Sequence, residues 1–204
     1  MSHYFQTPTG QERRREITAR FWDADWTFET ADGVFAADRL DIGTSVLLRA
    51  CAPPAGPGRV LDLGCGWGPI AVALAVASPS LLVDAVDVNE RALDLCRRNA
   101  ERHGVADRVR AFTPAATSPD EDRAVYDEIW SNPPIRVGKA ALRELLATWL
   151  PRLKPGGAAR LVVGKNLGAD SLQRWLEAEG WSCRRVASAK GFRVFEVVRQ
   201  GPSA

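Results

Sequence analysis

The sequence predicts an α/β fold in which a seven-stranded, mostly parallel sheet carries helices on both faces. Apolar strands and amphipathic helices alternate between residues 59 and 179, a pattern that is typical of parallel sheets because parallel neighbours need a crossover connection. The last two predicted strands, 182–188 and 192–199, are joined by only about three residues around Lys190-Gly191. A link this short joins antiparallel strands, so the last strand is expected to run against the rest of the sheet.

Glycine and proline positions and apolar periodicity divide the chain into these elements. Residues 1–24 are expected to form a polar leader, and residues 25–200 a single domain that opens with a β-hairpin at 26–36 around Ala31-Asp32-Gly33. Asn89 is expected to cap the helix that follows it, and Gly104 to end that helix. Further strands are predicted at 59–63, 81–87, 108–112, 126–131 and 158–164, and helices at 44–50, 69–77, 90–103, 139–153 and 169–179.

Composition and cysteine spacing exclude several classes of protein. Of the 204 residues, 46% are hydrophobic and 25% charged, the balance of an ordinary globular domain, and no apolar run approaches the roughly 20 residues of a membrane span. The four cysteines are scattered and there are only two histidines, so no metal site is expected. The first ten residues lack the apolar core of a signal peptide. We therefore expect a cytoplasmic protein without a metal.

Charge is unevenly distributed along the chain. Residues 1–130 contain 14 Lys/Arg and 20 Asp/Glu, a net charge of −6, whereas residues 131–204 contain 13 and 5, a net charge of +8. A basic C-terminal third is typical of a protein that meets an anionic partner on that side. Ordinary solvated charge is the alternative interpretation.

The strongest motif is a glycine-rich turn, Gly64-Cys65-Gly66-Trp67-Gly68, between a predicted strand and a predicted helix. Glycines permit a tight turn and let the backbone approach a ligand closely. A dinucleotide site needs the spacing G-x-G-x-x-G, so that a helix N-terminus faces a pyrophosphate, but here the third glycine comes one residue early. Asp62, expected at the mouth of the turn, would repel a pyrophosphate and attract an ammonium. Spacing and charge together favour S-adenosylmethionine over a dinucleotide.

A second acidic residue supports a nucleoside ligand. Asp87 ends the second strand of the sheet, about 20 residues after the glycines, where a carboxylate can accept hydrogen bonds from both ribose hydroxyls. The alternative is a glycine-rich turn with incidental acids. The cofactor-binding residues predicted in this region are Asp62, Gly64, Cys65, Gly66, Gly68, Asp87 and Val88.

The fourth strand of the sheet runs into Asn132-Pro133-Pro134-Ile135, which predicts the chemical site. Consecutive prolines fix their φ angles and lack backbone N–H groups, so the turn is rigid and rich in acceptors, namely the Asn132 side-chain oxygen and the Pro133 carbonyl. Two fixed acceptors can hold the two N–H donors of an exocyclic amine and stabilise the positive charge that builds on its nitrogen. A loop that merely ends the strand is the alternative.

These motifs resemble the small-domain methyltransferase family that includes the ribosomal RNA small-subunit guanine-N2 methyltransferases. The resemblance runs from about residue 27 to 199 and looks like the catalytic half of those enzymes standing alone. It implies a Rossmann-like class I methyltransferase fold, S-adenosylmethionine as cofactor, and Asn132, Pro133, Pro134 and Ile135 as the amine-binding turn. It also implies that Phe35, Asp41 and Thr44 contact the methionine end of the cofactor and that Asn132 binds the cofactor as well.

The sequence departs from this family at three positions. Arg136 stands where many relatives have a His after the Asn-Pro-Pro motif. Ile135 stands where relatives usually have a Tyr or Phe that stacks on the base, which leaves Phe35 and Trp22 as candidates for stacking. Residues 113–116 lack the Asp that often binds the adenine amino group.

The expected substrate is RNA, acted on by a monomer or homodimer. Guanine N2 of ribosomal RNA is the first hypothesis, with adenine N6, a protein glutamine and a non-catalytic binding module as alternatives. Phosphate contacts are expected from Arg136, Lys139, Lys165, Lys190 and Arg193, for which solvent exposure alone is the other interpretation.

Overall fold

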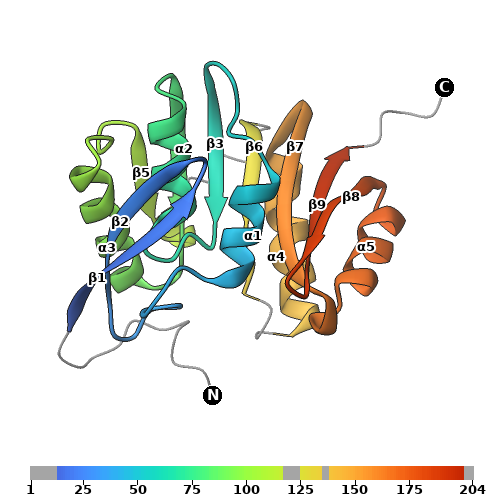
Figure 1. Cartoon of the computed structure of the whole chain (residues 1–204). Helices are drawn as coiled ribbons and strands as arrows, with labels where there is room; N and C mark the ends of the chain where they lie inside the picture. Colours follow the sequence, from blue (N-terminus) through green and yellow to red (C-terminus); the bar gives the residue numbers. More distant parts are fainter. Residues whose placement is uncertain (1–12, 117–124, 135–137, 200–204) are drawn as a thin grey trace.

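The structure of this chain is a computed structural model that describes residues 13–116, 125–134 and 138–199. Figure 1 shows a central sheet with helices on either side and a separate N-terminal hairpin. In chain order the elements are β1 (Arg14–Phe21), β2 (Ala24–Ala31), α1 (Ile42–Ala50), β3 (Gly58–Leu63), α2 (Pro69–Ala77), β4 (Leu81–Val86), α3 (Glu90–Arg102), β5 (Val109–Phe112), η2 (Pro114–Ala116), β6 (Tyr126–Ser131), α4 (Lys139–Trp149), η5 (Leu150–Arg152), β7 (Leu153–Gly164), η6 (Lys165–Leu167), α5 (Ala169–Ala178), β8 (Trp181–Ala189) and β9 (Phe192–Arg199).

The seven-stranded sheet has the order β5-β4-β3-β6-β7-β9-β8. The first five strands in this order pair in parallel, and β9 lies antiparallel between β7 and β8. The predicted mostly parallel sheet with an antiparallel end is therefore confirmed. The β8–β9 turn explains the reversal, because Lys190 and Gly191 both have positive φ, 50° and 81°, as the tightest hairpin turns require.

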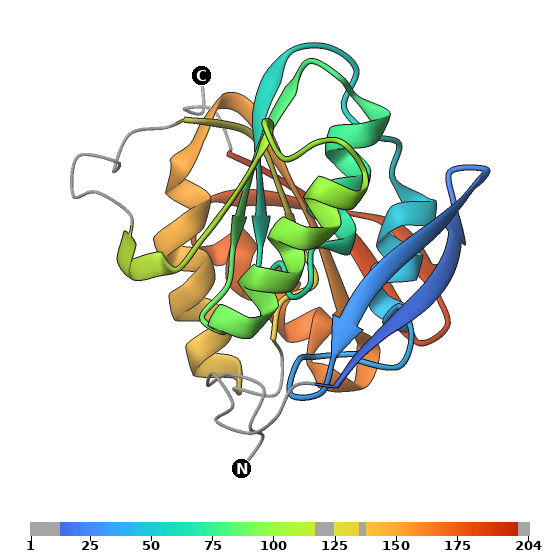
Figure 2. The same cartoon turned by 90° about the vertical axis from the view of Figure 1, so that its left-hand side faces the viewer.

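Two hydrophobic cores lie on opposite faces of the sheet. The hairpin, α1, α2 and α3 cover one face, where Val60, Val83 and Val162 point toward them. On the other face α4 and α5 pack on Leu61, Ile129 and other strand residues. Figure 2 shows the sheet between these layers, with α4 on one side and the hairpin and α1 on the other. Among the described helices, none combines the length and apolar character of a membrane span.

The hairpin lies earlier in the chain than the sequence predicted. Its strands are β1 and β2, and its turn is at Trp22-Asp23, so residues expected in the polar leader form β1 and the expected strand 34–36 lies in a turn. The strand β1 begins with charged residues, so its sequence does not show a clear alternation of apolar and polar residues, although Ile17 and Phe21 are buried. The turn contains no glycine that would mark it in the sequence. Its positive φ angles, 47° and 56°, are adopted by Trp22 and Asp23.

Most other boundaries agree with prediction to within a few residues. The clearest difference is the helix expected at 139–153, which ends at Trp149. Pro151 lacks a backbone N–H and cannot continue an α-helix, so the chain makes a short 3-10 turn and then enters β7 at Leu153, earlier than expected.

This topology gathers the candidate residues at one edge. The carboxyl ends of β3, β4 and β6 are neighbours, and in Figure 1 the arrowhead of β3 points downward to this edge. The antiparallel strand β9 begins at the same edge, because its first residue, Phe192, pairs with Gly164 at the end of β7. Segments from both halves of the chain therefore meet there.

Candidate functional site

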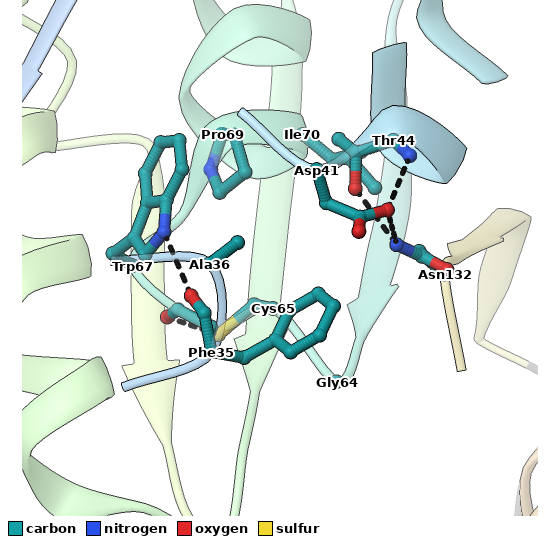
Figure 3. A pocket seen from close by; sticks show the side chains of 11 residues that line it. Phe35, Ala36, Asp41, Thr44, Gly64, Cys65, Trp67, Pro69, Ile70 and Asn132 are labelled. Atoms are coloured by element: carbon teal, nitrogen blue, oxygen red, sulfur yellow. Dashed lines mark hydrogen bonds between the residues drawn. The ribbon is translucent and has the colours of Figure 1, made fainter. Parts of the chain in front are cut away.

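A cavity of about 280 Å³ opens at the carboxyl ends of β3, β4 and β6. A smaller recess of about 30 Å³ continues it beneath Phe35, and Asp41, Gly64, Gly66 and Asn132 line both spaces. Figure 3 shows the recess between the glycine loop and the start of α1. The wall of the large cavity is formed by Phe35, Asp41, Leu63, Gly64, Gly66, Val86, Asp87, Val88, Asn89, Ala92, Pro114, Asn132, Pro133, Pro134, Leu145, Leu167 and Phe192.

The three glycines of the loop serve different purposes. All three have positive φ, which disfavours other residues. A Cβ on Gly66 would meet no atom within 4 Å, so this backbone faces open space on the cavity side. A Cβ on Gly68 would lie 2.6 Å from the Cys96 Sγ atom. Gly68 is therefore required for packing against α3 and lies outside the cavity wall, whereas Gly64 and Gly66 form part of it.

Cys65 and Trp67 also belong to this loop and line the recess. Burial raises the pKa of the Cys65 thiol, which makes it a poor nucleophile. Trp67 is buried, and its Nε1 donates a hydrogen bond to the Phe35 carbonyl at 3.1 Å (Figure 3). Trp67 thus holds the segment that carries Phe35 over the glycine loop.

Asn99 joins the hairpin to the same loop. Its Nδ2 donates to the carbonyls of Glu29, at 2.9 Å, and Trp67, at 2.8 Å, while its Oδ1 accepts from the Glu29 N–H at 2.7 Å. Asn99 is fully buried. Sequence reasoning missed this residue, because a single polar residue inside an amphipathic helix carries no signal of its partners.

Asp62 lies beneath the glycine loop, not at its mouth as the sequence suggested. The residue has no exposed surface and is absent from the cavity wall. Its Oδ2 accepts a hydrogen bond from the Ala71 N–H at 2.9 Å, and its Oδ1 has no partner among the described residues. Burial raises the pKa of Asp62 to about 8. The carboxyl group therefore ties the end of β3 to the first turn of α2, on either side of the loop.

Asp87 lies at the cavity wall, as its position after β4 predicted. Its Oδ2 accepts from the Gly66 N–H and its Oδ1 from the Asn89 N–H, both at 2.9 Å. Burial raises the pKa of this carboxyl group. Because each carboxylate oxygen has a second lone pair, Asp87 can accept further hydrogen bonds from a ligand while it holds the loop.

The Asn132 amide is held in one orientation. Its Nδ2 donates to Asp41 Oδ2 at 2.8 Å and to Thr44 Oγ1 at 3.0 Å (Figure 3). An ionised carboxylate only accepts hydrogen bonds, so the nitrogen must face Asp41. Both amide N–H groups are used in this way, and Oδ1 remains as an acceptor in the residue that lines both parts of the cavity.

A buried hydroxyl positions the turn that contains Asn132. Ser131 Oγ donates to the Leu63 carbonyl at 2.6 Å, which links the end of β6 to the start of the glycine loop. As a result, Pro134 Cδ would lie 3.7 Å from a Cβ on Gly64. Pro133 and Pro134 both line the cavity. Ile135 and Arg136, which were predicted to contact the substrate, lie outside the described residues.

The other residues expected at the methionine end also converge here. Asp41 caps α1 by accepting from the N–H groups of Gly43, at 2.7 Å, and Thr44, at 3.2 Å. Phe35 lines both spaces and is 44% exposed. Val88 also lines the large cavity.

Three of the predicted basic residues lie together beside the cavity. Lys165 donates its backbone N–H to the Gly191 carbonyl at 2.8 Å, next to Lys190. The Lys139 Cε atom would lie 3.2 Å from a Cβ on Gly168, at the end of η6. All three lysine side chains are exposed, and none forms an ion pair within the described part of the chain. Arg193 differs, because it is only 15% exposed and pairs with Asp170.

Two expectations about apolar contacts change. Trp22, a candidate for stacking on a base, does not line the cavity and instead donates a hydrogen bond to the Cys51 carbonyl at 3.0 Å. Leu145, Leu167 and Phe192 do line it, although sequence reasoning gave them no role. No local pattern distinguishes such residues from core residues.

The residues present fit S-adenosylmethionine. Open space lies over Gly66, an acidic acceptor stands at Asp87, and the narrow recess at Asp41 and Thr44 continues the cavity toward Asn132. A ligand with a nucleoside at one end and a small polar chain at the other would match this sequence of surfaces.

Comparison with known proteins agrees with the site. The model of the methyltransferase small domain family matches residues 25–196. The uncharacterized protein YbxB of Bacillus subtilis is 30% identical over 194 residues, which cover 95% of this chain and 96% of that protein. The ribosomal RNA small subunit methyltransferase C of Hahella chejuensis is 35% identical over 174 residues, 83% of this chain. Here the chain spans about half of the relative, 48% of its length.

A solved structure shows the same fold. The T. thermophilus 16S rRNA N2 methyltransferase (RsmC), in complex with AdoMet and guanosine, superimposes with a TM-score of 0.72 at 24% identity, over 95% of this chain and 52% of that one. The family match, the cavity at the carboxyl edge and the glycine loop agree with one another. The chain belongs to the methyltransferase small domain family, whose members are S-adenosylmethionine-dependent methyltransferases.

Proposed function

We propose that this protein methylates an exocyclic amine of a nucleic-acid base, and that the target is guanine N2 of ribosomal RNA. The observation that carries the proposal is the fixed orientation of Asn132, whose two N–H groups are held by Asp41 and Thr44. An amide held in this way offers only its oxygen to a substrate, and an amine is a substrate that donates.

The cofactor-binding surface is assigned to the residues that line the recess and the nucleoside end of the cavity. Asp87 would accept the ribose hydroxyls, and Phe35, Asp41, Thr44, Gly64, Cys65, Gly66 and Val88 would surround the rest of the cofactor. Asp62 and Gly68 would not contact the cofactor, and would instead hold the glycine loop in the shape that binds it. When bound, S-adenosylmethionine supplies an electrophilic methyl group on a sulfonium.

Asn132 and Pro133 would hold the amine for the transfer. Asn132 Oδ1 and the Pro133 carbonyl accept its two N–H donors and turn the nitrogen lone pair out of conjugation. As the new N–C bond forms and the S–C bond breaks, positive charge grows on the nitrogen, and the same oxygens stabilise that charge. The extra proton then leaves to solvent, so this step needs no strong base.

The choice of RNA as substrate rests on charge and on relatives. Lys139, Lys165 and Lys190 lie beside the cavity and form no ion pair with any described residue. Residues 131–204 carry a net charge of +8. Relatives over the matched region bear the name ribosomal RNA small subunit methyltransferase C.

Labelled methyl transfer onto RNA tests the proposal. Ribosomal RNA from a strain that lacks the protein would be incubated with the full chain and labelled S-adenosylmethionine, then digested for nucleoside mass spectrometry. We expect N2-methylguanosine. Label in N6-methyladenosine would show that the target base is adenine and not guanine. Label found only in a glutamine-containing protein fraction would refute a nucleic-acid substrate.

A further inference from the structure

An exocyclic amine is attached to a flat ring, so its site needs apolar surface beside the acceptors. The described part of the cavity offers such surface near Asn132. A Cβ on Gly43 would lie 3.2 Å from Asn132 Oδ1 and 2.9 Å from Phe192 Cε1. These two atoms are therefore within about 6 Å of each other, close enough for one planar base to contact both.

Phe192 is placed rigidly. It begins β9 and pairs with Gly164 at the end of β7. The turn before it is held by the Lys165 N–H, which donates to the Gly191 carbonyl at 2.8 Å. The ring lines the cavity and packs beside the core on the α1 face.

Two leucines supply further apolar surface. Leu145 of α4 packs beside the core on the α4 face and also lines the cavity. Leu167 covers Gly164, because its Cδ1 would lie 2.9 Å from a Cβ there. Leu167 is nevertheless 48% exposed. Covering exposed apolar surface of this kind with a ligand is favourable, because it removes that surface from water.

A lysine lies close in sequence to each of Phe192 and Leu167. Lys190 stands two residues before Phe192, and Lys165 two residues before Leu167. Both side chains are exposed. A nucleotide combines a flat base with an anionic phosphate, and this arrangement offers apolar walls with cations next to them. A glutamine side chain would need neither.

We propose that Phe192 and Leu167 form the two walls of a slot that holds the acceptor base, with Phe192 as its stacking surface. This inference rests on the proposed function. It assigns to β9 and η6 the contact that sequence comparison would seek at Ile135. Binding of the base would then depend on residues about 60 and 30 positions after the Asn-Pro-Pro turn.

The test uses the full chain with S-adenosylhomocysteine bound and guanosine 5′-monophosphate as probe. Ligand-detected NMR titration would give the probe's Kd for wild type, Phe192→Ala, Phe192→Trp and Leu167→Ala. Leu82→Ala is the control, because Leu82 is similarly exposed, at 55%, but is not part of the cavity wall. Ribose 5-phosphate serves as a probe that has the phosphate but no base.

We expect Phe192→Ala to weaken binding of the nucleotide about 10- to 100-fold, as loss of an aromatic stack on a base does. Leu167→Ala should weaken it several-fold, while Phe192→Trp and Leu82→Ala should remain within about threefold of wild type. Binding of ribose 5-phosphate and of S-adenosylhomocysteine should not change. In methyl transfer to ribosomal RNA, Phe192→Ala should raise KM more than it lowers kcat.

Two results would overturn the slot while leaving the proposed function in place. One is nucleotide binding by Phe192→Ala that equals wild type. The other is an equal loss of S-adenosylhomocysteine binding, which would assign Phe192 to the cofactor. If wild type binds no nucleotide and methylates no RNA, the proposed function fails and the slot fails with it.

Discussion

Asn132 Nδ2 and Asp41 Oδ2 lie 2.8 Å apart, although 91 positions separate them in the sequence. The same Asp41 oxygen caps α1 by accepting from the N–H groups of Gly43 and Thr44. One carboxylate therefore both caps a helix and sets the direction of the Asn132 amide.

Asp41→Ala should remove both roles, whose effects can be measured separately. Loss of the cap should lower the free energy of unfolding by about 1 kcal/mol. The freed amide can rotate and present its N–H groups to the substrate, so we expect turnover to fall about tenfold or more. Urea unfolding and methyl-transfer kinetics measure the two effects. Thr44→Ser, which keeps the second acceptor, is the control and should retain turnover. Full turnover in Asp41→Ala would show that Asn132 does not need this partner.

Asn132→Ala should lower kcat about 100- to 1,000-fold, because it removes a preorganised acceptor for charge that develops on the amine. The Kd of S-adenosylmethionine should change little. Calorimetry of cofactor binding and single-turnover methyl transfer on RNA measure the two quantities. Turnover that survives the substitution contradicts the mechanism.

Asp87→Ala should weaken cofactor binding about 10- to 100-fold, since a hydrogen bond to a charged group contributes about 1.5–3 kcal/mol. Calorimetric titration with S-adenosylhomocysteine provides the measurement. Asp94→Asn, on α3 and outside the cavity wall, removes a carboxylate without touching the site. The ribose assignment is wrong if the two variants bind the cofactor equally well.

Asp62 should make stability depend on pH. Burial raises its pKa to about 8 in the folded chain, from about 3.9 in an unfolded one, so between these values only the folded state keeps the proton. The free energy of unfolding should therefore fall as pH rises from about 4 to 8 and level off above.

The comparison variant is Asp62→Asn, which is neutral and has nearly the same shape. Urea unfolding of both proteins without cofactor, at pH 5 to 9, isolates this group because all other titrating residues are shared. The wild type should lose stability relative to the variant as pH rises. A constant difference across this range would contradict a raised pKa.

Salt dependence should reveal phosphate contacts. If Lys165 and Lys190 each neutralise one phosphate of a single-stranded target, each change to alanine should reduce the slope of log K against log salt by about 0.7. Filter binding of ribosomal RNA at several salt concentrations measures the slope. Lys154→Ala is the matched control, because Lys154 is also basic and half-exposed but pairs with Asp127 at the far end of β7. Equal slopes for all variants would place the RNA elsewhere.

The sequence alone determined the fold class and the chemical character of the site. Alternation of strands and helices is a local signal that repeats along the chain, and it fixes a parallel sheet because crossovers permit little else. The glycine spacing and the Asn-Pro-Pro turn are also local, since each needs only a few consecutive residues to define its backbone. Asp87 could be placed because strand ends gather at one edge.

Only the tertiary structure decided how these parts meet. It set Asp41 against Asn132, placed Asp62 below the loop, and brought Phe192 and Leu167 into the cavity wall that also contains Asn132. It also moved the hairpin to β1 and β2, where residues with positive φ make a turn without glycine. These relationships depend on contacts between distant segments, and side-chain direction at such contacts is set by packing, which no short stretch of sequence encodes.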